Sequence, residues 1–479
     1  MKRRLLLFTT LILTIVNIWA FDFEKDGIYY MIYSTTSPCN VGVVSGTINY
    51  TGSVTIPETV TFNGVTYAVN FITGSAFSNC TKLTSVSIPN TVTEIGEWAF
   101  GNCSGLVTVS LPNAITKIYD YTFNGCSSLT SIAIPETVTS LGEYAFGSCS
   151  GLTSIVIPGK TTYLGEYVFF GCNGLTTVTI PNSVTTLDWG VFNSCKNLQT
   201  INIPGSVTSI GWYTFSFCSA LTSINVDSSN QKFSSKDGVL YNKSMTELIT
   251  CPGGYFNTYT MPNTVTDIND FAFAECSKLT TVVLLNNLIN IKDDAFIRCS
   301  KLTSINLPES LSFIGYDAFG ECSSLNSITL PAKIEFLGNL VFNGCANLKS
   351  IHMKAPVPIV LDEDYPNTFA GLSTSTCVLY VPAGSKTAYQ NAPQWWYFEN
   401  IIEETTGIQT VTAKELGLFI NDNKIVITNL HKGEMVQIVT TDGKIVFSMK
   451  VSEPTLEIKL PTTKMYIVKV GSKSAKIFL

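Results

Sequence analysis

Apolar residues recur along most of this chain at a fixed interval of 23 residues, and a cysteine marks each interval. A leucine follows three residues after the cysteine and a valine or isoleucine six after it. An isoleucine or leucine usually comes eight after it, often followed by proline. Apolar and polar residues alternating over so short a stretch predict a β-strand, which the proline ends because it cannot donate a backbone hydrogen bond. The cysteines form two series: Cys80, Cys103, Cys126, Cys149, Cys172, Cys195, Cys218, then Cys276, Cys299, Cys322, Cys345.

The second half of each interval has apolar positions of its own. A valine or isoleucine stands twelve residues after the cysteine, and an isoleucine or leucine fifteen after it. The Ala-Phe-x-x-Cys stretch suggests a one-turn helix, although it is too short for a firm assignment. The phenylalanines three residues before each cysteine are expected to stack as a continuous spine: Phe77, Phe100, Phe123, Phe146, Phe169, Phe192, Phe215, Phe273, Phe296, Phe319, Phe342.

A fixed period of this length is typical of a chain built from stacked copies of one small unit. The expected fold class is therefore a repeat solenoid, a leucine-rich array of 23-residue coils with one short strand per coil. Such an array grows in one dimension and offers a long surface without a natural pocket. This favours binding over catalysis.

The charge balance excludes one class of partner. Charged residues make up only 13% of the 479 residues, and the net charge is −6, which becomes −9 when Lys2, Arg3 and Arg4 are removed with a leader. Arg298 is then the only arginine. Recognition of phosphate relies on clustered arginine and lysine, so no nucleic-acid partner is expected.

The first 20 residues have the pattern of a secretory signal peptide. A basic start precedes a mostly apolar run over residues 5–18, and Ala20 is a small residue at a plausible cleavage site. The apolar run is short for a membrane span, although an uncleaved anchor remains the alternative. No transmembrane segment is expected after removal of the signal.

Fourteen cysteines in an exported protein would ordinarily suggest disulfides. Here each coil places its cysteine at the same point, so the sequence favours a column of buried free thiols. Disulfides between coils stay open, because coils about 4.8 Å apart lie within disulfide reach. No zinc or other metal is expected, since there is no Cys-x-x-Cys and the only histidines are His352 and His431.

Catalytic chemistry is not indicated. Neither histidine has an obvious partner for a triad, and the acidic cluster Asp362-Glu363-Asp364 lacks the alternating spacing of a calcium loop. No glycine-rich phosphate loop links a strand to a helix. No catalytic residue, no cofactor and no enzymatic activity are therefore expected.

Two surfaces remain as candidates for binding. The strand face carries serine and threonine in most coils, which either reflects β-propensity or forms a contact face for protein or glycan. A second row lies one or two residues before the Ala-Phe step, accompanied by acidic neighbours. Its rings either pack on one another or anchor a partner. They are Trp98, Tyr121, Tyr144, Tyr167, Trp189, Trp212, Tyr213 and Tyr316.

The pattern AFxxCxxLTSVxIPxxVTxIGE resembles the BspA-type leucine-rich repeat of bacterial surface proteins over residues 74–400. Residues 21–73, with an Asn63-Gly64 hairpin turn, resemble that family's N-terminal β cap, and residues of about 227–262 resemble its hairpin insertion. The resemblance implies a non-enzymatic adhesion or protein-interaction scaffold that binds host or bacterial surface proteins. The alternative is a carbohydrate-binding surface accessory protein, with a glycan as partner.

The remaining segment has a different character. After a linker at residues 401–410, residues 411–479 are rich in lysine and contain short alternating apolar runs, with an Asp442-Gly443 turn signal. These runs predict a small antiparallel β-sandwich. The ending is similar to the C-terminal sorting domain of the type IX secretion system, which implies that this machinery is a partner and that the protein is exported to the outer-membrane surface or beyond. An immunoglobulin-like module is the alternative.

Overall fold

The computed structural model describes residues 21–361, 367–404, 409–410, 417–421, 424–428, 430–441, 444–460, 465–471 and 473–478. The predicted signal peptide, the Asp362-Glu363-Asp364 cluster and the Asp442-Gly443 turn lie outside these residues. The chain forms two compact units, one of residues 1–379 with 390–400 and one of residues 380–389 with 401–479.

The first unit begins with a β-sheet of order β1-β2-β3-β6-β5. The Asn63-Gly64 turn is confirmed, because both residues have positive φ angles of 49° and 79° and join antiparallel strands. β6 also pairs in parallel with β8, the first short strand of the array, so the sheet covers the end of the coil stack. Its strands are β1 (Phe23–Lys25), β2 (Ile28–Ser34), β3 (Asn40–Val43), β5 (Thr59–Phe62), β6 (Val65–Ile72) and β8 (Glu94–Ile95).

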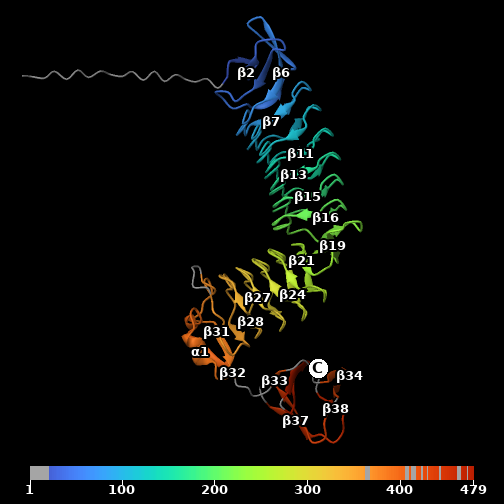
Figure 1. Cartoon of the computed structure of the whole chain (residues 1–479), viewed down its shortest axis with the longest axis vertical. Coiled ribbons are helices and arrows are strands. Elements are labelled where there is room, and N and C mark those ends of the chain that lie inside the picture. Colours follow the sequence, from blue (N-terminus) through green and yellow to red (C-terminus); the bar gives the residue numbers. More distant parts are fainter. Residues whose placement is uncertain are drawn as a thin grey trace, which may run out of the picture. The chain divides into compact units, whose positions relative to one another are not determined.

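The repeat register is confirmed, since paired residues of adjacent coils are 23 apart, as in Ile155 with Val178. Figure 1 shows the coils lying one beside the next. The strands three to eight residues after the cysteine are β7 (Leu83–Ser87), β9 (Thr108–Ser110), β12 (Ser154–Val156), β14 (Thr177–Thr179), β16 (Thr200–Ile203) and β18 (Ser223–Val226). In addition, the coils carry a second, two-residue parallel strand: β10 (Lys117–Ile118), β11 (Ser140–Leu141), β13 (Tyr163–Leu164), β15 (Thr186–Leu187) and β17 (Ser209–Ile210).

Antiparallel strands interrupt the array where the cysteine spacing breaks. β19 (Phe233–Lys236) and β20 (Val239–Asn242) form a hairpin, and β20 pairs with β21 (Glu247–Thr250). β22 (Asn257–Thr260) already pairs in parallel with the next coil, Tyr259 lying opposite Val282, so the 23-residue register resumes there. The second series consists of β23 (Asp267–Ile268), β24 (Leu279–Val283), β25 (Asn290–Ile291), β26 (Ser304–Asn306), β27 (Phe313–Ile314), β28 (Ser327–Leu330), β29 (Phe336–Leu337) and β30 (Ser350–Met353).

The phenylalanine spine is confirmed and forms the centre of the array. From Phe77 to Phe215 the rings stack with centroids 5.0 to 6.0 Å apart, and Phe273 to Phe342 form a second stack. The spine rings in these stacks are almost fully buried. Each coil therefore contributes one ring to a core that extends from coil to coil.

The cysteines of the two series line the spine as free, almost entirely buried thiols. All of them except Cys80 and Cys276 donate the S–H to the carbonyl oxygen of the phenylalanine 26 residues earlier, as from Cys149 to Phe123 and from Cys172 to Phe146, at 3.2 and 3.1 Å. Burial raises the pKa of Cys172 to about 12. Because the thiolate is the reactive form, the column is chemically quiet.

The one-turn helix suggested by Ala-Phe-x-x-Cys is wrong. In each coil the residues five and one before the cysteine adopt left-handed φ angles, for example 56° at Tyr121 and 76° at Gly125. Alternate N–H groups of the segment point to the next coil, so that Phe100 donates to the carbonyl of Thr122 at 2.9 Å. A helix would need those donors for its own carbonyls.

The second unit contains the small β-sandwich that the sequence predicts. Its two sheets, β33-β40-β39-β36-β37 and β34-β35-β38, share a core that includes Ile425, Val436, Ile458, Tyr466 and Val468. The strands are β33 (Gln409–Thr410), β34 (Leu418–Asn421), β35 (Lys424–Ile427), β36 (Met435–Thr440), β37 (Ile445–Lys450), β38 (Leu456–Lys459), β39 (Met465–Val470) and β40 (Lys473–Phe478).

Short elements follow the last regular coil in the sequence, and two of them, β31 and β32, extend its sheet. The elements are β31 (Val378–Pro382), α1 (Lys386–Asn391), η1 (Trp395–Tyr397) and β32 (Asn400–Glu404). Trp395 is fully buried, whereas Trp396 beside it is 53% exposed. Among the residues that the structure describes, no helix has the length and apolar character needed to span a bilayer.

Candidate interaction surface

Four of the predicted site residues form a continuous stack on the outside of the first array. Trp98, Tyr121, Tyr144 and Tyr167 each lie five residues before the cysteine of their coil. Successive rings are 4.4, 5.2 and 5.0 Å apart, with interplanar angles of 4°, 8° and 14°. All four are half-buried. We call this row the aromatic ladder.

The ladder rings are attached to a backbone that does not suit them. Their φ angles are 57°, 56°, 47° and 54°, in the left-handed region that bulky residues rarely adopt. Such strain costs about 1–3 kcal/mol per residue. The next coil has Gly190 at this position, and a Cβ there would lie 2.2 Å from the ring of Tyr167. The ladder therefore ends at Tyr167.

The other predicted rings do not continue this row. Trp189 and Trp212 lie one residue earlier in their coils and stack on each other at 5.7 Å, with 46% and 58% of their surfaces exposed. Tyr213 packs against Phe271 at 4.2 Å. Tyr316 is 41% exposed and has no ring partner among the described residues. The eight residues are thus one stack of four, one pair and two separate side chains.

Carboxylates accompany the ladder, one residue before each ring: Glu97, Asp120, Glu143 and Glu166. We call them the carboxylate ladder. Tyr121 donates its hydroxyl to Oε1 of Glu143 at 2.8 Å, and Oδ1 of Asp120 accepts the backbone N–H of Glu143 at 2.8 Å. Burial raises the pKa of Glu166, and the carboxylates of Asp188 and Glu143 raise it further.

A shallow hollow of about 400 Å³ lies beside these carboxylates and was missed by the sequence analysis. Tyr119 and Tyr163, which is 50% exposed, stand on the two outer coils of a group of three. The middle coil has only Ser140 and Gly142 at the corresponding positions. Because these two small residues lie between two tyrosines, the hollow remains open. Comparing positions fourteen and sixteen after the cysteine across adjacent coils would have revealed it.

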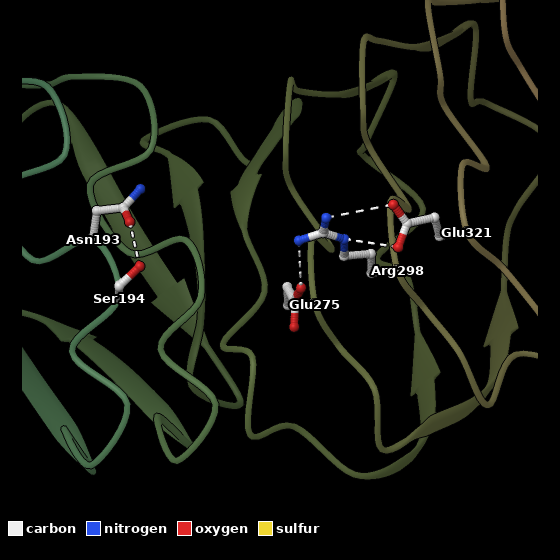
Figure 2. Close-up of polar contacts among 5 residues, drawn as sticks. All are labelled: Asn193, Ser194, Glu275, Arg298 and Glu321. Carbon is white, nitrogen blue, oxygen red and sulfur yellow. Dashed lines mark hydrogen bonds and ion pairs between the residues drawn. The ribbon is translucent and has the colours of Figure 1, made fainter. Parts of the chain in front are cut away.

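In the second array, an arginine forms ion pairs with carboxylates of the two neighbouring coils. Glu275, Arg298 and Glu321 lie one residue before the cysteine in three successive coils, and the guanidinium bridges both carboxylates (Figure 2). The N–O distances are 3.2 Å to Glu275 and 2.9 Å to Glu321. The same guanidinium lies 5.8 Å from the ring centre of Phe217. Figure 2 also shows Ser194 and Asn193, whose side chains bond to each other at 2.7 Å.

Some hydroxyl groups on the strand face already form hydrogen bonds within the array. Thr176 and Thr222 donate their hydroxyls to backbone carbonyls of the preceding coil, both at 3.2 Å. His352 lies 3.1 Å from the hydroxyl of Ser350, and the exposed side chain of His431 lies 3.6 Å from Glu434. Within the described residues, no group of three or more His, Cys, Asp or Glu side chains could hold a metal ion.

Comparison with known proteins identifies the repeat. The family model described as the BspA type leucine rich repeat region matches residues 52–159, 139–255 and 250–368. A leucine rich cell surface protein from Faecalibacterium prausnitzii A2-165 has 29% sequence identity and a TM-score of 0.65, over 79% of this chain and 97% of that one. No curated protein matches the chain.

Two further solved structures share the fold. A leucine-rich repeat protein from Bacteroides ovatus ATCC 8483 is 26% identical, with a TM-score of 0.53 over 80% of this chain and 100% of that one. The pneumococcal vaccine antigen PcpA is 21% identical, with a TM-score of 0.59 over 80% of this chain and 98% of that one, a likeness of fold alone.

Proposed function

Because the chain belongs to the BspA-type leucine-rich repeat family, we propose that it is a non-enzymatic adhesion scaffold, displayed on the bacterial surface, that binds surface proteins of a host or of other bacteria. The likeness to a cell surface protein supports this location. The observation that carries the proposal is the aromatic ladder with its adjoining carboxylates.

The ladder suits protein binding for two physical reasons. Rings held in a stack lose little conformational entropy when a partner covers them, and tyrosine and tryptophan dominate the energetics of many interfaces. The left-handed backbone beneath the rings is common to every coil, as at Ser75 and Leu340, and so belongs to the repeat rather than to the ladder.

Replacing Tyr121, Tyr144 and Tyr167 by glycine is expected to weaken binding to immobilised surface proteins by about 100-fold or more, as for removal of a hot-spot cluster. Glycine is chosen because it adopts the left-handed φ of these residues without strain. Binding of the purified chain is measured by surface plasmon resonance, and circular dichroism checks that the fold is retained.

Phe336→Ala is the control for this experiment, since it removes an exposed ring, stacked at 4.7 Å on Phe313, from the second array. Equal binding by the triple variant and the parent chain would contradict a role for the ladder. Capture of glycans but not of proteins in the same assay would favour the carbohydrate-binding alternative.

We further propose that residues 411–479 are the export signal read by type IX secretion machinery. The sandwich has its own core, separate from that of the array, as expected of a module with its own task. Deleting residues 411–479 in a bacterium with this machinery is expected to leave the protein in the periplasm. Surface labelling with a membrane-impermeant reagent measures the exposed fraction.

The matched control replaces the same residues by an unrelated β-sandwich of similar size. It should also be retained inside the cell if the sandwich is read specifically. Normal surface labelling of the deleted protein would refute the sorting role and leave the adhesion proposal standing.

A further inference from the structure

The carboxylate ladder has no ion-pair partner within the described residues. Glu97, Asp120, Glu143 and Glu166 recur every 23 residues, so neighbouring carboxylates lie on coils about 4.8 Å apart. None of them forms an ion pair in the part of the chain that the structure describes. Like charges on adjacent coils repel each other, so this edge of the array is electrostatically unfavourable by itself.

The second array shows, at a different position of the coil, how a cation can neutralise stacked carboxylates. There, Arg298 lies between Glu275 and Glu321 and binds both. The arginine stands on the coil between the two glutamates, so a cation at the coil spacing contacts a carboxylate on either side. In the first array no described cation forms such an ion pair with the carboxylate ladder.

We infer that the carboxylate ladder and the aromatic ladder together bind an extended lysine- or arginine-rich segment of a partner protein. This inference rests on the adhesion proposal and specifies its partner. Cationic head groups pair with Asp120, Glu143 and Glu166, while their aliphatic stems lie along the edges of the neighbouring rings. The hollow between Tyr119 and Tyr163, which Asp120 also lines, accepts one long side chain. Polyanionic partners are repelled.

One residue opposes this binding and provides a sensitive test. Lys117 also lines the hollow and is exposed. Its ammonium group repels a cation that enters beside it. Lys117→Gln is therefore expected to tighten binding of a cationic segment by about 3-fold, the size of one exposed charge interaction. A merely structural role of the hollow would produce no gain.

The test uses the chain without its first 20 residues and a dye-labelled peptide of about twelve alternating lysine and serine residues, long enough to span several coils when extended. Fluorescence anisotropy measures the dissociation constant. The triple variant Asp120→Asn, Glu143→Gln, Glu166→Gln keeps the hydrogen-bond acceptors and the shape. It is expected to weaken binding by about 10-fold or more at low salt, with little further loss in about 0.5 M NaCl.

Two controls distinguish an effect of the carboxylate ladder from an effect of the net charges of the protein and the peptide. The variant Glu58→Gln, Glu335→Gln, Glu453→Gln removes three exposed carboxylates elsewhere and should bind like the parent. A peptide of alternating glutamine and serine should bind neither protein. Equal weakening by both triple variants, equal binding of both peptides, or no effect of the ladder variant would each overturn the inference.

The outcome also separates this inference from the adhesion proposal. If the carboxylate variant still binds the immobilised surface proteins while the glycine variant of the aromatic ladder does not, the adhesion proposal stands and the cationic partner is wrong. If both variants lose surface-protein binding together with peptide binding, the partner's cationic segment is supported.

Discussion

Phe146→Ala is expected to lower the free energy of unfolding by about 3–5 kcal/mol. The Phe146 side chain is fully buried and stacks between Phe123 at 5.5 Å and Phe169 at 5.8 Å. Its removal leaves a cavity in the spine and takes away two ring contacts. Neighbouring coils cannot collapse into the space, because the backbone hydrogen bonds between coils fix their separation.

The loss should also change how the array unfolds. Each coil contacts only its neighbours, so a weak interface in the middle divides the stack into two cooperative blocks. Urea unfolding followed by tyrosine fluorescence should therefore show a broader or a second transition. Phe336→Ala, which removes a 45% exposed ring, should cost about 1 kcal/mol or less and keep one transition. Similar losses at both positions would contradict the spine's role.

Stability is expected to fall steeply as the pH rises from 9 towards 12. Burial raises the pKa of Cys103, Cys172 and Cys218 to about 12, from an ordinary value of 9.0. Below pH 9 these thiols are protonated in both states and contribute no pH dependence. Above it the unfolded chain releases protons that the folded chain retains, so the unfolded state gains stability. Each thiol contributes about 1.4 kcal/mol per pH unit.

Those three thiols together predict a loss of about 4 kcal/mol per pH unit in that range. Buried tyrosines such as Tyr241, whose pKa burial also raises, add to the loss. Thermal unfolding at a series of pH values, under reducing conditions, measures the slope. Cys172→Ala should reduce the slope by the contribution of one thiol, about 1.4 kcal/mol per pH unit. A midpoint that does not change between pH 9 and 11 would show that the thiols are accessible in the folded chain.

The side-chain pattern predicted the parts of the fold that repeat in every coil. Cys149 and Phe146 could be placed in the core from spacing alone, because a coil buries the same positions at every turn. The left-handed backbone at Tyr144 could not be predicted, since that conformation favours glycine and asparagine and the residue is neither. The helix suggested for Ala-Phe-x-x-Cys failed for the same reason.

The candidate surface was predicted only in part. Spacing revealed the row of rings, but a one-residue offset separates Trp189 and Trp212 from Tyr167, and only the backbone shows where the stack ends. The hollow beside Ser140 is formed by two positions of the repeat in three adjacent coils. It therefore cannot be recognised from the sequence of a single repeat. The sequence shows Arg298 as a lone arginine, but its position between two glutamates depends on the register of three coils.

The hydrogen bonds that pass from each coil to the next give the stack a direction. Trp98, Phe100 and Asn102 all donate to carbonyls of the following coil, whereas Thr139 and Gly142 donate to carbonyls of the preceding one. Each face of a coil therefore carries donors and acceptors that match those of the opposite face of the next coil. A fragment cut cleanly between coils would present complementary ends, and head-to-tail joining of such ends has no closing symmetry and leads to filaments. The β-sheet formed by β1, β2, β3, β5 and β6 covers one end of the array and keeps its unpaired backbone groups out of solution.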